Sequence, residues 1–185
     1  MTMQIPDDFC WNGKDDWELL GIQPRLLFDP AAYGIPVGSD RLTACYRGYY
    51  CRFKVEQEQL KLDRLTVFAV EGIEQPPFNG IRPQHVKKPF LFYQYLDLEF
   101  SLPYSGTVWL GQAPEAARGG GMHEIVDYRE MHALVFERGM LIRTEDYSEL
   151  LADIRAQTDM SSIEKVIMAC ELTLPREERL QYEFR

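Results

Sequence analysis

Alternation of apolar and polar side chains runs through the middle of this chain, and it constrains the fold more than any other feature. Successive side chains of a β-strand point to opposite faces, so a period of two predicts strands with one buried face. Sheets with one buried and one wet face are typical of antiparallel architectures. The sequence therefore predicts a mostly antiparallel β fold, with strands expected at 43–55, 60–70, 91–102, 107–110, 128–137 and 140–144.

Two of these stretches echo one another. Residues 53–62 and 133–142 each read as a β-hairpin, with alternating apolar positions on both sides of a short polar turn. This repeat predicts two similar hairpin-based halves, 40–72 and 95–145, packed as a sandwich or a partly closed barrel, with any site at their junction. The matched positions are Phe53 with Ala133, Val55 with Val135, Leu60 with Met140, and Leu62 with Ile142.

The two ends of the chain have a different character. Turn-forming residues punctuate 1–42, which predicts an irregular arm with one helical turn at Asp15–Leu20. The extension 146–185 carries helix-start signals, Asp146 before 147–157 and a capping box at Ser161–Glu164. Its segment 161–174 is rich in β-branched residues, so helix and strand both remain open. The expectation is a single α+β domain over residues 1–185, with helices near the C-terminus.

Composition narrows the class of partner. The chain has 185 residues and a net charge of −9, which disfavours nucleic acid as a partner and would attract a cationic protein. No signal peptide, membrane-spanning run or CxxC pair is visible, so we expect a cytoplasmic protein with reduced cysteines, no membrane partner, and neither cofactor nor metal.

The segment Tyr46–Tyr50 is the most unusual part of the first predicted strand. Arg47 falls among apolar neighbours, where a guanidinium needs a carboxylate partner, and Glu130 or Asp127 in the second half is the expected one. Gly48 inside a strand indicates a bulge or a close approach of another segment. The simplest interpretation is a structural ion pair that joins the two halves.

The functional interpretation of the same segment is a binding surface. Tyr46, Tyr50 and Arg52 share the opposite strand face and belong to residue types enriched in binding hot spots. Together with Arg47 they form the predicted binding residues.

Catalytic signals are sparse, and no nucleophile elbow, phosphate loop or zinc-protease motif is present. His123 adjoins Glu124, and Glu130 shares a strand face with His132, so imidazole and carboxylate groups could meet as a general base requires. The alternative is that these are polar residues on the wet face of the sheet.

The segment Thr43-Ala-Cys-Tyr-Arg-Gly-Tyr49, with its following Phe-x-Val strand and Leu-x-Leu return, resembles an uncharacterised bacterial protein family. Members of that family carry a T-A-x-[aromatic]-R-G-Y segment, a later strand that ends in a Ser-Gly turn, and a second hairpin. The resemblance covers about 40–70 and 95–145 and leaves out the extension 146–185. It implies a small, β-rich bacterial protein and no assigned activity.

Two functional hypotheses follow. The first is a non-enzymatic protein-binding module, of the immunity or inhibitor kind, that neutralises a cationic partner. The second is a small-ligand-binding or hydrolytic β-barrel whose site uses His123, Glu124, Glu130 and His132 at the junction of the halves. The oligomeric state is left open by the sequence.

Overall fold

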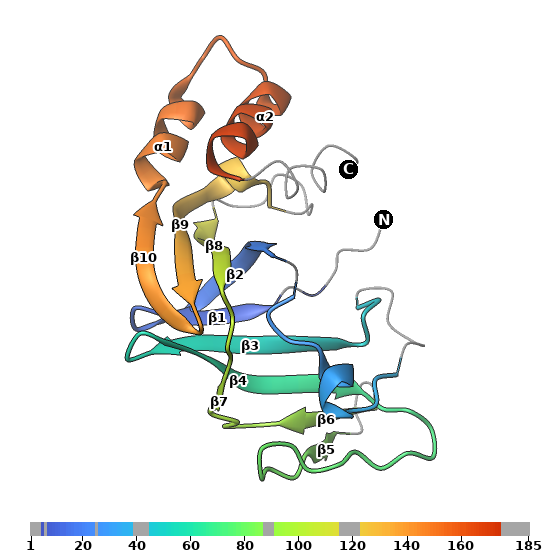
Figure 1. The fold of residues 1–185 in the computed structure, drawn as a ribbon. Helices are drawn as coiled ribbons and strands as arrows, with labels where there is room; N and C mark the ends of the chain where they lie inside the picture. The colour runs from blue at the N-terminus through green and yellow to red at the C-terminus, as the bar shows by residue number, and fades with distance from the viewer. Residues whose placement is uncertain are drawn as a thin grey trace.

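The computed structural model describes residue 5 and residues 7–24, 26–38, 45–86, 91–114 and 123–174 (Figure 1). These residues form ten strands, two short 3₁₀ helices and two α-helices. In chain order the elements are β1 (Asp8–Trp11), β2 (Lys14–Gln23), η1 (Pro30–Tyr33), β3 (Tyr49–Glu56), β4 (Gln59–Phe68), β5 (Gln84–Val86), β6 (Phe92–Tyr95), β7 (Phe100–Ser101), β8 (Gly106–Pro114), η2 (Ile125–Asp127), β9 (Tyr128–Glu137), β10 (Met140–Asp146), α1 (Ser148–Ala156) and α2 (Ser162–Thr173).

All ten described strands belong to one sheet, in the order β10-β9-β8-β2-β1-β3-β4-β6-β5, with β7 added beside β4. Among the described strands, β1 and β3 pair in parallel, with Phe9 opposite Phe53, and the remaining pairs are antiparallel. The prediction of a mostly antiparallel fold with helices near the C-terminus is confirmed. Figure 1 shows β8, β9 and β10 running across the direction of β3 and β4, so the sheet is strongly curved.

The sheet is partly closed into a ring where the tips of two hairpins meet, although it is not a complete barrel. The backbone N–H of Leu60 donates to the Gly139 carbonyl at 2.8 Å, and that of Leu141 donates to the Glu58 carbonyl at 2.7 Å. Met140 pairs with Gln59, which joins β10 to β4. The two hairpins that echo each other in sequence are therefore in direct contact at their turns.

The sequence match between the two hairpins is shifted by one residue from their structural correspondence. The residues that flank the two turns are Glu56 and Gln59 in the first hairpin and Glu137 and Met140 in the second. The sequence alignment instead placed Leu60 on Met140, and Leu60 is fully buried while Met140 is 40% exposed. Both stretches form hairpins as expected, and their origin by duplication stays a prediction.

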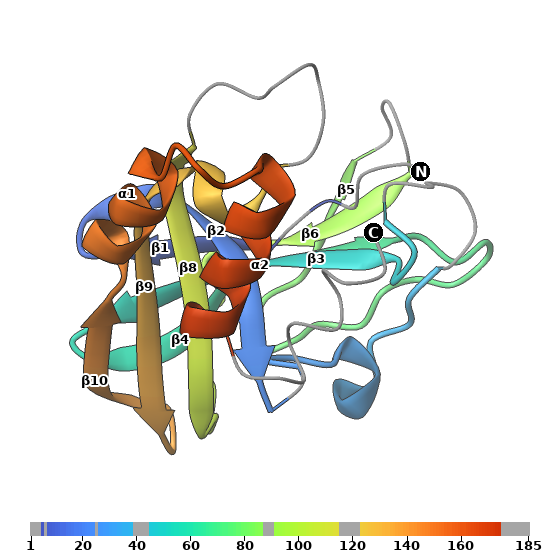
Figure 2. The same ribbon diagram turned by 90° about the horizontal axis from the view of Figure 1, so that it is seen from above.

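Two apolar clusters stabilise the fold. The larger one fills the concave side of the curved sheet and includes Phe9, Trp17, Phe53, Leu62 and Leu134. The smaller one lies on the outer face of β8 and β9, where both α-helices pack, as Figure 2 shows from above. Burial of these side chains is the main favourable term in folding. The smaller cluster consists of Trp109, Ile125, Met131, Ala133, Leu151, Ile154, Ala169, Cys170 and Leu174.

Both helices begin close to the predicted positions, although the N-cap position of α1 is Tyr147 and not Asp146. Asp146 Oδ1 accepts a hydrogen bond from the Ser148 N–H at 2.9 Å as α1 begins. At α2, the Ser161 N–H donates to Glu164 Oε2 at 2.7 Å and the Glu164 N–H donates to Ser161 Oγ at 3.3 Å, a complete capping box. Segment 162–173 is therefore helical. Within the described residues, neither helix is long and apolar enough to span a bilayer, and residues 175–185 of the extension lie outside that part of the chain.

The expectation of an irregular N-terminal arm with a helical turn at Asp15–Leu20 is wrong, because that segment lies within strand β2. β2 pairs with β1 on one side and with β8 on the other. Its sequence is polar enough to suggest a loop, but the two sets of cross-strand hydrogen bonds and the burial of Trp17 outweigh local propensity.

The first predicted strand begins later than expected. β3 starts at Tyr49, and Cys45–Gly48 forms a turn closed by a 3.0 Å hydrogen bond from the Gly48 N–H to the Cys45 carbonyl. Gly48 has a φ of +71°, and a Cβ there would lie 2.1 Å from the Gly38 carbonyl oxygen. The close approach expected at this glycine is present, whereas residues 43 and 44 lie outside the described residues.

The long strand expected at 91–102 is also wrong. β6 ends at Tyr95, and Asp97 and Glu99 adopt left-handed φ values of +52° and +48°. These two residues break the alternation, so that Tyr95 and Leu98 are both buried although they lie on opposite faces of the predicted strand. The chain then resumes pairing with β4 through the short strand β7.

Replacement of Gly139 by alanine tests the closure of the sheet. A Cβ at this position, where φ is +86°, would lie 2.2 Å from the Leu102 carbonyl oxygen. We expect Gly139→Ala to lower the free energy of unfolding by about 3 kcal/mol or more, through left-handed strain and a backbone clash. The control is Gly72→Ala, with a φ of +74° and open space around the added Cβ, for which only the strain of about 1 kcal/mol applies. Equal losses in urea unfolding would contradict this role of the hairpin tips.

Candidate functional site

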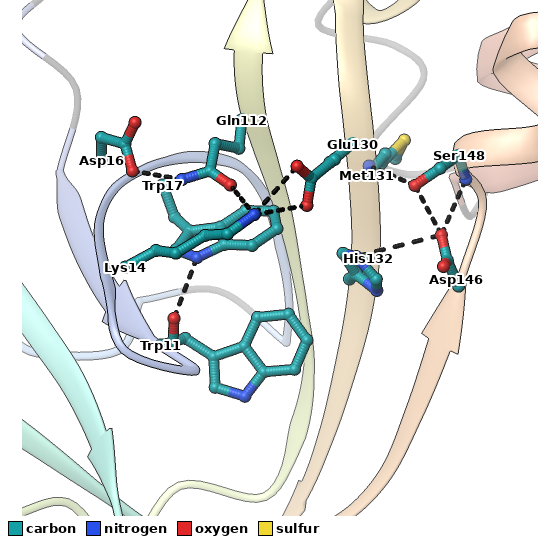
Figure 3. A network of polar contacts seen from close by, with 10 residues as sticks. All are labelled: Trp11, Lys14, Asp16, Trp17, Gln112, Glu130, Met131, His132, Asp146 and Ser148. Atoms are coloured by element: carbon teal, nitrogen blue, oxygen red, sulfur yellow. Dashed lines mark hydrogen bonds and ion pairs between the residues drawn. The ribbon is translucent and has the colours of Figure 1, made fainter.

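On the concave side of the sheet, a group of polar and aromatic side chains lies beside the larger apolar cluster. Glu130 and His132 alternate along β9 in phase with Leu134 and Phe136, which belong to the core. Gln112 reaches the same place from β8, and Trp11, Lys14 and Trp17 come from the β1–β2 hairpin. Figure 3 shows these side chains gathered at one point. We call this group the β9 cluster: Trp11, Lys14, Asp16, Trp17, Gln112, Glu130 and His132.

Lys14 is the centre of the polar part of the β9 cluster. Its Nζ donates to both carboxylate oxygens of Glu130, at 2.9 and 2.8 Å, and to Gln112 Oε1 at 2.8 Å. The Gln112 amide in turn donates to Asp16. Lys14 and Glu130 remain 44% and 40% exposed, so this ion pair is in contact with solvent. The Glu130 carboxylate therefore has a cationic partner within the protein.

Three rings form the aromatic part of the cluster. The His132 ring lies edge-on to Trp11 and Trp17, with centroids 5.0 and 5.3 Å away. The indole N–H of Trp17 donates to the Trp11 carbonyl at 3.1 Å. Lys14 Nζ lies 5.6 Å from the centroid of the Trp17 ring, within the range of a cation–π contact.

His132 faces a carboxylate that already has two donors. Its Nε2 lies 3.9 Å from Asp146 Oδ1, while the Ser148 N–H and hydroxyl donate to that same oxygen at 2.9 and 2.5 Å. Burial would raise the pKa of Asp146, but the hydrogen bonds from Ser148 outweigh it and lower the pKa. The serine hydroxyl donates to a carboxylate and not to the imidazole, so this is not the arrangement that activates a serine nucleophile.

His123 and Glu124 do not join the β9 cluster in any contact of the described residues. The His123 ring contacts Tyr128, with centroids 5.9 Å apart, and its Nδ1 is buried without a hydrogen-bond partner among the described residues. The Glu124 N–H donates to Asp127 Oδ2 at 2.8 Å at the start of η2. The four residues considered for catalysis therefore divide into two pairs, one at the end of the core and one beside η2.

The predicted partner of Arg47 is wrong. Arg47 forms a bidentate ion pair with Asp7, at 2.9 and 2.6 Å, and neither Glu130 nor Asp127 takes part. Asp7 is only 6% exposed and also accepts a hydrogen bond from the Cys51 N–H at 2.7 Å. Asp7 immediately precedes β1, which pairs in parallel with β3, and this pairing brings the carboxylate to Arg47.

The other predicted binding residues, Tyr46, Tyr50 and Arg52, differ in exposure and pairing, and their binding role stays a prediction. Tyr46 is 69% exposed at the turn before β3, and Tyr50 is half-buried on β3. Arg52 forms ion pairs with Asp15 at 3.1 Å and Asp63 at 3.6 Å. The cation of this patch is thus already paired within the sheet.

A second surface was missed by the sequence analysis. We call it the helical layer: α1, α2 and the loop between them, residues 148–174. Ile163 and Ile167, which follow the capping box of α2, are 73% and 52% exposed, and the helix packs through Ala169 and Cys170. The sequence contains a signal for this surface: with Met168 and Leu172 in addition to Ile163 and Ile167, the helix has more apolar residues than one face can bury.

The helical layer is also strongly acidic. Its two cations are engaged by backbone carbonyls: Arg155 donates to Val126 and Tyr128, at 3.0 and 2.7 Å, and Lys165 donates to Arg155 at 2.7 Å. The carboxylates of the layer are on its exposed surface, and those that form no ion pair with any described residue are Glu149, Asp153, Asp159, Glu164 and Glu171.

Within the described residues, no group of three or more His, Cys, Asp or Glu side chains is placed to hold a metal ion. Comparison with protein-family models, with curated proteins and with solved structures finds no match to this chain. The resemblance to a bacterial family stays a prediction, and function must be inferred from the surfaces of the molecule itself.

The Asp7–Arg47 pair gives a direct test of how the segment before β1 is held. Asp7→Asn removes the buried carboxylate that pairs with the partly exposed Arg47 guanidinium and accepts from the Cys51 N–H, and we expect a loss of roughly 2 kcal/mol in the free energy of unfolding. The control is Asp15→Asn, whose carboxylate is 70% exposed in its ion pair with Arg52, so stability should hardly change. Urea denaturation measures the free energy of unfolding of both variants. If Asp7→Asn is as stable as Asp15→Asn, the contact between Asp7 and Arg47 does not stabilise the fold.

Proposed function

We propose that this chain is a non-enzymatic protein-binding module that takes a cationic protein partner, in the manner of an immunity protein or inhibitor. The observation that carries the proposal is the charge arrangement of the helical layer. Both of its cations are held by backbone carbonyls, whereas Glu149, Asp153, Asp159 and Glu171 project from it without an ion pair to any described residue.

The physical reason is that unpaired surface carboxylates create a negative potential outside the molecule. Such a potential speeds the encounter with a positively charged partner and selects against anionic ones. On the β3–β4 face, by contrast, Lys54 and Lys61 lie between acidic side chains and form ion pairs with Glu99. Charge there is compensated locally, so the helical layer is the better surface for a basic partner.

A cytoplasmic location and a bacterial source fit this proposal, since inhibitors of basic toxins and nucleases act inside the cell that makes them. Neither the location nor the source is needed for the electrostatic argument. The oligomeric state is likewise independent of it.

Removal of the charges of the helical layer tests the proposal. The variant carries Glu149→Gln, Asp153→Asn, Asp159→Asn and Glu171→Gln, and the probe is an oligolysine peptide. We expect this variant to bind the peptide at least about tenfold more weakly than the wild type at low salt, and both affinities to fall as salt rises. Isothermal titration calorimetry measures the dissociation constants.

The matched control removes four carboxylates elsewhere, through Glu58→Gln, Glu71→Gln, Glu74→Gln and Glu137→Gln, all exposed positions outside the helical layer. Both variants change the net charge by the same amount. If the control weakens binding as much as the helical-layer variant, net charge alone governs the attraction and the proposed surface is wrong.

A second candidate function is a small-ligand or hydrolytic site at the β9 cluster. The observation in its favour is the convergence of Trp11, Trp17 and His132 beside the solvent-exposed Lys14–Glu130 pair. Aromatic walls with a few convergent polar groups are typical of ligand sites. Displacement of Lys14 from Glu130 by a ligand cation, or of Glu130 from Lys14 by a ligand anion, would open the cluster.

A thermal-shift screen of small molecules against the wild type and the Glu130→Gln, His132→Ala double variant distinguishes this candidate. A ligand at the cluster raises the melting temperature of the wild type and not that of the variant. A ligand that stabilises both proteins equally binds elsewhere, and that outcome would exclude the β9 cluster as its site.

A further inference from the structure

Helix α2 exposes more apolar surface than its packing explains. Ile163, Ile167, Met168 and Leu172 are 73%, 52%, 37% and 54% exposed, although the opposite side of the helix packs on the outer face of the sheet. Large apolar side chains gathered on one exposed helix face mark an interaction surface more often than scattered single ones do.

These residues form two rows along the helix. Ile163 and Ile167 are four residues apart and lie one above the other, and Met168 and Leu172 form a second row in the same way. At about 100° per residue, Glu164 and Glu171 fall between the two rows. Hydrogen bonds from the Ser161 hydroxyl and backbone lower the pKa of Glu164, so its carboxyl is ionised at neutral pH. The exposed face of α2 therefore presents apolar, acidic and apolar strips side by side.

The acidic strip selects among possible occupants of this face. A second copy of the chain would bring carboxylates against carboxylates, and an anionic membrane surface would be repelled for the same reason. A basic segment would gain ion pairs in the centre and apolar contacts on both sides. Charge complementarity thus favours a partner that is both cationic and apolar.

We infer that the exposed face of α2 docks an amphipathic basic segment of a partner protein. Apolar side chains of that segment pack on Ile163, Ile167, Met168 and Leu172, and its lysines or arginines meet Glu164 and Glu171. This inference rests on the proposed function and deepens it, because it names the docking surface and the chemistry of the segment. Carboxylates of α1, Glu149 and Asp153, provide the surrounding negative field.

The test compares two peptides of about 18 residues made of leucine and lysine, a length sufficient for helix formation on binding. In one peptide the leucines recur at helical spacing with lysines beside them, and in the other the same residues are scrambled. The wild type should bind the amphipathic peptide at least about tenfold more tightly than the scrambled one. Fluorescence anisotropy with labelled peptides at moderate salt measures both dissociation constants.

Variants locate the binding site. Ile163→Ser, Ile167→Ser and Leu172→Ser together should weaken binding of the amphipathic peptide at least about tenfold and leave binding of oligolysine unchanged. The matched control is Ile73→Ser, Leu91→Ser and Ile142→Ser, which removes apolar side chains that are 45%, 49% and 59% exposed outside the helices. Circular dichroism and melting temperature confirm that both variants are folded.

Several outcomes would overturn the inference. Equal affinity for the two peptides would contradict the docking surface and leave the proposed function standing. Failure of oligolysine to bind would contradict the proposed function itself.

Other results would identify a different occupant of the α2 face. If the wild type is a dimer and the α2 variant is a monomer, the occupant is a second copy of the chain. If the wild type binds phosphatidylcholine vesicles and the α2 variant does not, the occupant is a membrane. Tighter peptide binding after Leu180→Ser, Tyr182→Ser and Phe184→Ser would assign the face to the chain's own segment 175–185.

Discussion

The contact between the tips of the β3–β4 and β9–β10 hairpins is the constraint on which the rest of the structure depends. Gly139 donates to the Tyr104 carbonyl at 2.7 Å and accepts from Leu60 at 2.8 Å, so one residue without a side chain is bonded from two directions. This contact bends the sheet until its inner face can be filled by a single cluster of side chains. It also leaves the outer face of β8 and β9 apolar and uncovered by strands, and the two helices pack there.

Local patterns were sufficient to predict the elements whose side chains alternate or whose ends are capped. The two hairpins, the start of α1 and the capping box of α2 follow from period-two alternation and from side chains that bond nearby backbone groups. The same rules failed where distant contacts decide. β2 is a strand because β1 and β8 pair with both of its edges, and Asp97 and Glu99 end β6 by adopting left-handed conformations that residue type alone does not reveal.

In the candidate surfaces, too, the features set by local patterns could be predicted and those set by distant contacts could not. Glu130 and His132 could be placed on one face from their spacing in β9, but Lys14 and the two tryptophans could not, because the arm that carries them had no recognisable strand signal. Arg47 was correctly expected to need a carboxylate. Its partner Asp7 is 40 residues away and arrives through a parallel strand pair, a pairing that hairpin reasoning does not consider. The face of α2 that is buried belongs to a cluster that also contains Trp109 and Met131, which are far away in sequence.

The position of β2 has a consequence for how the chain folds as it is synthesised. β2 lies between β1 and β8 in the sheet. Its contacts with β8 join residues that are far apart in the sequence, such as Lys14 and Gln112, which are separated by 98 positions. When the N-terminal hairpin leaves the ribosome, the strand that will cover its second edge has not yet been made. Native topologies with such long-range pairings fold slowly, and unpaired edges are prone to aggregate in the interval. This protein therefore has its greatest need of chaperone protection during translation, before residue 106 has emerged.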